Sequence, residues 1–197
     1  MVPFGETDRS KKIRAEAEKK LARLRVASEQ QWQKWLADEL QKQGHNVLMP
    51  EMPQPDNPDR GEWLLTIKNL LKNVETSDLI IVGHSLGVTT ALDFIEQSDT
   101  KIDGLVSVSG FAEDYGAELN GEFLKQKNLD FKKINNNLSW SSVLYGDDDP
   151  YVTQEALVYV AESLGVKPII LTNGGHLNSD TGYTTFPELL KRVKSKQ

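Results

Sequence analysis

Short apolar runs alternate along the chain with segments in which apolar residues recur every three or four positions. The runs are typical of buried strands, and the recurring positions are typical of helices with one buried face. Strands are predicted at residues 45–50, 79–82, 102–109, 142–145 and 168–172. Helices are predicted at residues 28–44, 63–71, 88–95, 154–164 and 186–194. Strands that alternate with helices indicate an α/β fold, a doubly wound, mostly parallel sheet covered on both faces.

The start of the chain breaks this alternation with an atypical basic arm. Residues 1–30 carry eight Lys or Arg and five Asp or Glu, a net charge of +3. Because the whole chain has a net charge of −6, the remaining residues carry −9. The arm is rich in Ala, Glu and Lys, which favours one helix with Ile13, Ala17, Leu21 and Leu24 on its inner face. The alternative is a substitute strand formed by Ala22, Leu24 and Val26. The predicted domains are the arm at 1–27 and a single domain at 28–197.

Composition narrows the classes of function. The 197 residues are enough for one sizeable core, and no cysteine is present. Disulfides, thiolate nucleophiles and zinc–cysteine sites are therefore excluded. The acidic body argues against a nucleic-acid partner. We find no secretory signal and no apolar stretch long enough to span a membrane, so we expect a cytoplasmic protein.

The pentapeptide Gly83-His84-Ser85-Leu86-Gly87 follows the apolar run 79–82 directly. A Gly-x-Ser-x-Gly that ends a strand and opens a helix is the form of a nucleophile elbow. We expect Gly83 and Gly87 to keep side chains out of the narrow gap between strand and helix. Ser85 is the candidate nucleophile, and the backbone N–H of Leu86 is a candidate oxyanion donor.

A serine nucleophile needs a base, and the chain has three histidines. His84, inside the elbow, is expected to point away from the nucleophile and to be structural. His45 is expected at the surface, far from Ser85. His176 follows the last predicted strand, and ligands bind beyond the carboxyl ends of parallel strands. His176 is therefore the candidate base.

The orienting acid should lie between nucleophile and base in the sequence. The run Asp147-Asp148-Asp149 follows the strand that ends at Tyr145. Its spacing does not fit a calcium loop, and no metal or other cofactor is expected. The spacing alone does not choose among the three aspartates.

From about residue 28 onward the chain resembles the small α/β-hydrolases grouped with the retinoblastoma-binding serine hydrolases and their bacterial relatives. The matching pieces are Gln31-Trp32, Trp35-Leu36, Met49 to Pro53, the elbow, Val108 to Phe111, Asp148 to Val152 and Gly174-Gly175-His176. The resemblance implies a compact α/β-hydrolase fold and places the acid on Asp149, the nucleophile on Ser85 and the base on His176. It also implies hydrolysis of small or short-chain acyl esters without a cofactor.

One part of that family's pattern is absent. Its members begin with an apolar strand and a glycine-rich loop that supplies the second oxyanion N–H, whereas residues 8–27 contain no glycine. We therefore expect the first central strand to be altered or missing and the activity to be weak, because one lost oxyanion donor costs about 10²–10³ in kcat. An unpaired sheet edge would also favour a homodimer through the arm.

The segment 110–138 leaves the alternation of strands and helices. It carries Phe111, Tyr115 and Phe123, which we take as candidate substrate-binding residues. The segment is either a short lid over the site or a helix packed on the sheet. Three functions remain open: an esterase, a hydrolase of thioesters or small amides, and a catalytically impaired fold that serves as a protein-interaction module.

Overall fold

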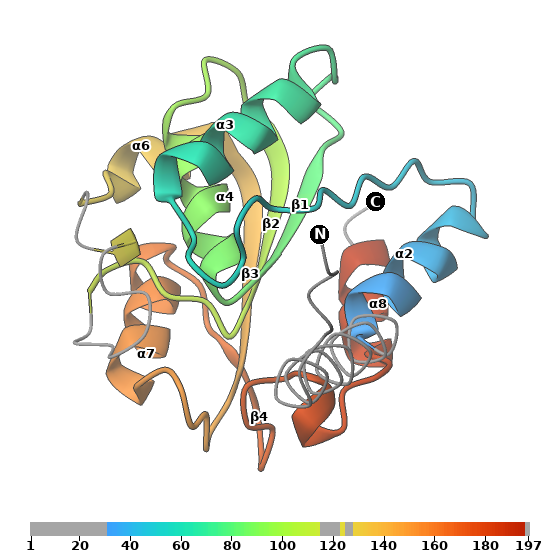
Figure 1. Cartoon of the computed structure of the whole chain (residues 1–197), viewed down its shortest axis with the longest axis vertical. Helices are drawn as coiled ribbons and strands as arrows, with labels where there is room; N and C mark the ends of the chain where they lie inside the picture. Colours follow the sequence, from blue (N-terminus) through green and yellow to red (C-terminus); the bar gives the residue numbers. More distant parts are fainter. Residues whose placement is uncertain (1–30, 115–122, 125–127, 196–197) are drawn as a thin grey trace, which may run out of the picture. The chain divides into compact units, whose positions relative to one another are not determined.

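The computed structural model describes residues 31–114, 123–124 and 128–195. It contains a parallel sheet of β1 (Ile80–His84), β2 (Ile102–Val108), β3 (Leu138–Gly146) and β4 (Ile169–Leu171). The strands lie in the order β1-β2-β3-β4, and each neighbouring pair is parallel (Figure 1). The predicted α/β class with a parallel sheet is therefore confirmed. The arm at residues 1–27, with its helix-or-strand question, lies outside the described residues.

The described residues form two compact units, residues 31–47 with 178–190 and residues 48–177 with 191–195. The first unit contains α2 (Trp32–Gln41), the short helix η1 (Ser179–Thr181) and the start of α8 (Pro187–Lys194). Trp32 meets the ring of Phe186 edge-on, with 5.7 Å between the ring centroids. Gln31 occupies the N-cap of α2, and the first residues of the helix predicted at 28–44 lie outside the described residues.

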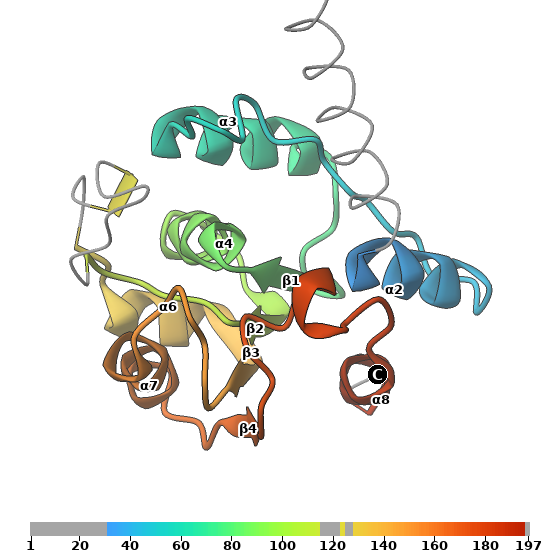
Figure 2. The same ribbon diagram turned by 60° about the horizontal axis from the view of Figure 1, so that its bottom comes forward.

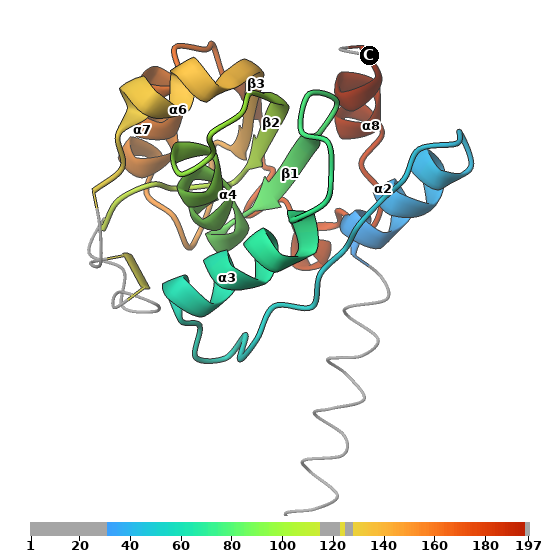
Figure 3. The ribbon, with the colours of Figure 1, turned by 90° about the horizontal axis from the view of Figure 1, so that it is seen from above.

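The second unit contains the sheet and α3 (Arg60–Leu71), α4 (Leu86–Glu96), α6 (Phe131–Asn137) and α7 (Gln154–Ser163). These helices share one apolar core with the strands. Figure 2 looks along the sheet, with α4, α6 and α7 on one side of it. Figure 3 shows α3 beside α4. No helix in the described part of the chain is long and apolar enough to cross a membrane.

The strand predicted at residues 45–50 is wrong, because this segment has no regular structure. Its apolar side chains do not enter the core: Leu48 and Met49 are 50% and 53% exposed. Pro50 closes the segment and has no backbone N–H to donate to a neighbouring strand. Among the described residues, no strand precedes β1 along the chain.

A buried ion pair joins α3 to α4. Arg60 donates to the carboxylate of Asp93 through Nε at 2.6 Å and through Nη2 at 2.9 Å. Both side chains are at most 4% exposed. The Nη1 group of Arg60 also donates to the carbonyl oxygens of Phe123 and Leu124. The pair thus fixes the helix before β1, the helix after it, and a short piece of the 110–138 segment.

The strand β1 and the helix α4 approach each other closely at Gly83. A Cβ atom built on Gly83 would lie 2.9 Å from both the backbone N and the Cα of Val88. No such contact exists at Gly87, where a Cβ would meet nothing within 4 Å. The expectation that both glycines keep a narrow gap open is therefore wrong for Gly87.

We expect Gly83→Ala to lower the free energy of unfolding by about 1–3 kcal/mol, because backbone atoms must move to admit the methyl group. Gly87→Ala is the matched control, and we expect it to be neutral or stabilising, because it adds a helix-favouring methyl in open space. Urea unfolding of both variants checks this. Equal destabilisation by the two changes would show that the close contact at Gly83 is unimportant.

Candidate active site

Ser85 stands in a strained turn between β1 and α4. Its backbone has φ 53° and ψ −124°, in a region that residues other than glycine rarely adopt. Two hydrogen bonds hold the turn: the Ser85 N–H donates to the carbonyl of Val108 on β2, and its carbonyl accepts from the N–H of Val88, both at 3.0 Å. The serine is thus fixed at the carboxyl end of the sheet, as an elbow requires.

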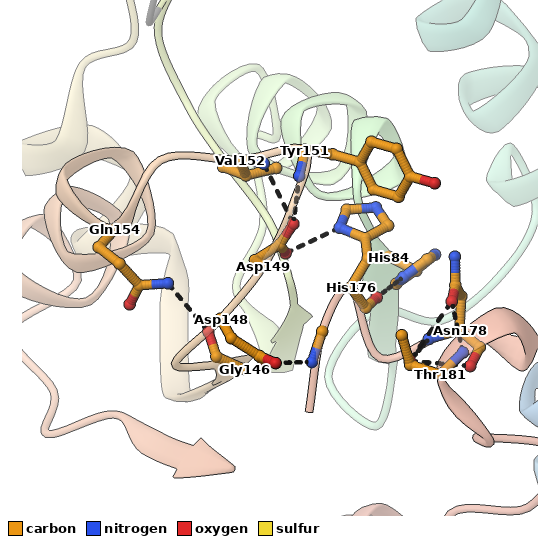
Figure 4. A network of polar contacts seen from close by, with 11 residues as sticks. His84, Gly146, Asp148, Asp149, Tyr151, Val152, Gln154, His176, Asn178 and Thr181 are labelled. Atoms are coloured by element: carbon orange, nitrogen blue, oxygen red, sulfur yellow. Dashed lines mark hydrogen bonds and ion pairs between the residues drawn. The ribbon is translucent and has the colours of Figure 1, made fainter. Parts of the chain in front are cut away.

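Asp149 and His176 are in direct contact. Asp149 Oδ2 lies 2.8 Å from His176 Nδ1, and the two side chains are 0% and 9% exposed (Figure 4). The other carboxylate oxygen accepts the N–H groups of Tyr151 and Val152 at 2.9 and 3.1 Å. Because an ionised carboxylate only accepts, Nδ1 carries the proton of the neutral ring. Nε2 is then left as the basic nitrogen.

The two aspartates before Asp149 hold the backbone of the loop that carries His176. Asp147 accepts the N–H of Asn173 at 2.8 Å, and Asp148 accepts the N–H of Gly175 at 2.7 Å. The three carboxylates therefore bind the same loop, and among them the contact with the imidazole belongs to Asp149. Sequence reasoning did not find the roles of Asp147 and Asp148. The sequence signal was only the run of three carboxylates itself, which offers three acceptors in a row.

His84 lies against His176 rather than standing apart from it. The His84 Nε2 atom is 2.9 Å from the carbonyl oxygen of His176, and the two ring centroids are 4.8 Å apart. A carbonyl only accepts, so Nε2–H of His84 is the donor. Burial, followed by the nearby His176, lowers the pKa of His84 from 6.5 to about 4. The ring is therefore neutral at pH 7.

The three predicted residues of the triad all follow strands of one parallel sheet at their carboxyl ends: Ser85 after β1, Asp149 after β3 and His176 after β4. The structure joins Asp149 to His176. Within the described residues, no hydrogen bond joins Ser85 Oγ to the His176 ring. Such bonds are often long in a free enzyme and tighten when substrate binds.

The remaining predicted site residues are placed as follows. Leu86 is the first residue of α4, and the first N–H groups of a helix have no acceptor within it. Phe111 and Phe123 are buried in the apolar core, and Phe123 meets Trp63 edge-on. Their role in substrate binding stays a prediction. Tyr115 lies outside the described residues.

Residues 24–195 match the model of the serine hydrolase family, so the chain belongs to that family. Its fold is the α/β-hydrolase fold. Over 165 residues the chain is 28% identical to YdeN of Bacillus subtilis strain 168. This match covers 83% of this chain and 86% of YdeN.

Solved structures agree with the α/β-hydrolase fold. The YdeN crystal structure superposes with a TM-score of 0.76 over 84% of this chain and 89% of that one. The structure of a YdeN-like protein of Pectobacterium atrosepticum, 22% identical in sequence, superposes with a TM-score of 0.65 over 84% of this chain and 82% of that one. The structure of the meta-cleavage product hydrolase CumD, 10% identical in sequence, superposes with a TM-score of 0.57 over 75% of this chain and 76% of that one. This is a likeness of fold alone.

We expect His84 to make folding pH-dependent. Below pH 6.5 the unfolded chain protonates this histidine, whereas the folded chain keeps it neutral to about pH 4. Stability is therefore lost as the pH falls through this window, by at most about 3 kcal/mol. Urea unfolding at pH 7 and at pH 4.5 measures the loss.

His84→Gln is the control, because glutamine can donate the same hydrogen bond and does not titrate. The variant should lose less stability than the natural chain between the two pH values. Equal losses would contradict the assignment of this window to His84.

Proposed function

We propose that the chain is a serine carboxylesterase that cleaves esters of small or short-chain acyl groups through an acyl-enzyme on Ser85. The observation that carries the proposal is the buried bond from Asp149 to Nδ1 of His176, at the same sheet edge as the strained Ser85 turn. A binding module has no need of this arrangement. Membership of the serine hydrolase family supports the same conclusion.

In the proposed reaction, Ser85 Oγ attacks the ester carbonyl while His176 Nε2 takes its proton. Asp149 keeps the proton of the neutral ring on Nδ1 and stabilises the imidazolium that forms. The N–H of Leu86 donates to the oxyanion. His176 then protonates the departing alcohol, and water repeats the two steps on the acyl-enzyme.

Narrower points belong to the same proposal. The motifs favour a place near the retinoblastoma-binding serine hydrolases and a reaction without a cofactor. A cytoplasmic location is proposed as the sequence-based expectation. We propose a small ester as substrate, with activity weaker than that of relatives that have a glycine-rich oxyanion loop. Contact between two copies through the arm remains a proposal that light scattering tests.

We expect a fluorophosphonate probe to add once to the natural chain and not to Ser85→Ala, as read by intact mass. Hydrolysis of p-nitrophenyl acetate by the variant should fall by about 10³–10⁴ in kcat, which is the roughly 10⁶ loss of a complete triad reduced by the missing oxyanion donor. A folded natural chain that takes no label would sink the esterase proposal and favour an interaction module.

The three aspartates allow a matched comparison. We expect Asp149→Asn to lower kcat by about 10³–10⁴, because the amide no longer fixes the tautomer of His176 or stabilises its cation. Asp147→Asn and Asp148→Asn keep an oxygen that accepts a backbone N–H, so their kcat should stay within about tenfold. The measurement is kcat on p-nitrophenyl acetate. A larger loss at Asp148 than at Asp149 would reassign the acid.

A further inference from the structure

The loop that carries His176 has a backbone that it would not adopt by itself. Asn173, Gly175 and Leu177 all have positive φ, at 53°, 54° and 49°. For a leucine this conformation costs about 1 kcal/mol or more, and it persists only where surrounding contacts impose it. Leu177 is fully buried, which supplies one such contact. The base therefore sits between two residues in left-handed conformations.

Hydrogen bonds from outside the loop supply the rest of the constraint. The carboxylates of Asp147 and Asp148 accept hydrogen bonds from the backbone N–H groups of Asn173 and Gly175, which precede the base. His84 donates to the carbonyl of His176 itself, at 2.9 Å. The first two bonds tie the loop to the turn that carries Asp149. The third ties it to the elbow, because His84 is covalently joined to Ser85.

We propose that His84 is a positioning residue, which fixes the backbone of the base relative to the nucleophile through its bond to the His176 carbonyl. This inference rests on the proposed function. The hydrogen bond of His84 ends on the carbonyl oxygen of His176, so His84 acts through the main chain of the base. A single side chain thus spans the distance between the residue before the nucleophile and the main chain of the base.

The neutral state of His84 suits this role. A cation at this position would stand beside an imidazole that must itself become charged during the reaction. The depressed pKa of His84, caused by burial and by His176, keeps the ring uncharged while it donates. A lysine or arginine could donate to the same carbonyl only by placing a charge there. The imidazole of His84 is therefore long enough to reach the carbonyl, donates a hydrogen bond to it and stays uncharged.

The test compares His84→Phe with His84→Gln on p-nitrophenyl acetate. Phenylalanine keeps an aromatic ring against His176 and removes the donor, whereas glutamine replaces the Nε2–H donor. We expect kcat to fall about 10-fold in H84F and to recover to within about 3-fold in H84Q, with KM changed less than twofold in both. The rates are divided by the number of sites that a fluorophosphonate titrates, so partial misfolding does not count as a loss of kcat.

An unchanged kcat per titrated site in H84F would overturn the proposal, and so would an equal loss in H84Q. A natural chain that is folded but takes no fluorophosphonate overturns the esterase function instead. The hydrogen bond is checked on the natural chain without substrate, by the ¹⁵N signals of its imidazoles at pH 7. Nε2–H on His84 is expected, and Nδ1–H would overturn the inference even if H84F failed to fold.

Discussion

The site depends on a backbone conformation that the chain must be forced to adopt. Ser85 has a positive φ. It lies in a tight turn, because the backbones of β1 and α4 are in close contact at Gly83. Such strain is retained only where the surrounding structure over-determines it. Here β2 supplies an acceptor for the Ser85 N–H, and α4 supplies the donor for its carbonyl. The nucleophile is therefore held by the sheet and the helix together rather than by its own preference.

Apart from α6, which lies in the segment 110–138 that was left open, the order of strands and helices in the second unit could be predicted from the sequence. Residues 102–109 and 168–172 were predicted as strands, and β2 and β4 lie within them. In β2 the apolar run is buried on both faces, as is usual in a parallel sheet, whereas in β4 Ile169 and Ile170 are exposed although the strand forms. The same reasoning failed at residues 45–50, where the apolar residues Leu48 and Met49 remain exposed. A short apolar run does not say by itself whether anything will cover it.

The candidate site divides in the same way. The elbow is local, so a pentapeptide after an apolar run predicts its turn. The choice among Asp147, Asp148 and Asp149 depends on where a loop 26 or 27 residues later docks, which no local pattern contains. The bond of His84 to His176 joins residues 92 positions apart. It could not be read from the elbow, although the expectation of a structural role for His84 came from the same pentapeptide.

The Arg60–Asp93 pair has a consequence for how the sequence can change over time. Each member alone would be a buried charge whose main counterpart is gone, a change that typically costs 3–5 kcal/mol, a large share of a domain's stability. A well-packed apolar pair could replace both at little cost. Descendants of this chain can therefore leave the ion pair only by altering both positions in close succession. Although they lie 33 positions apart in the sequence, the two residues are therefore expected to change together.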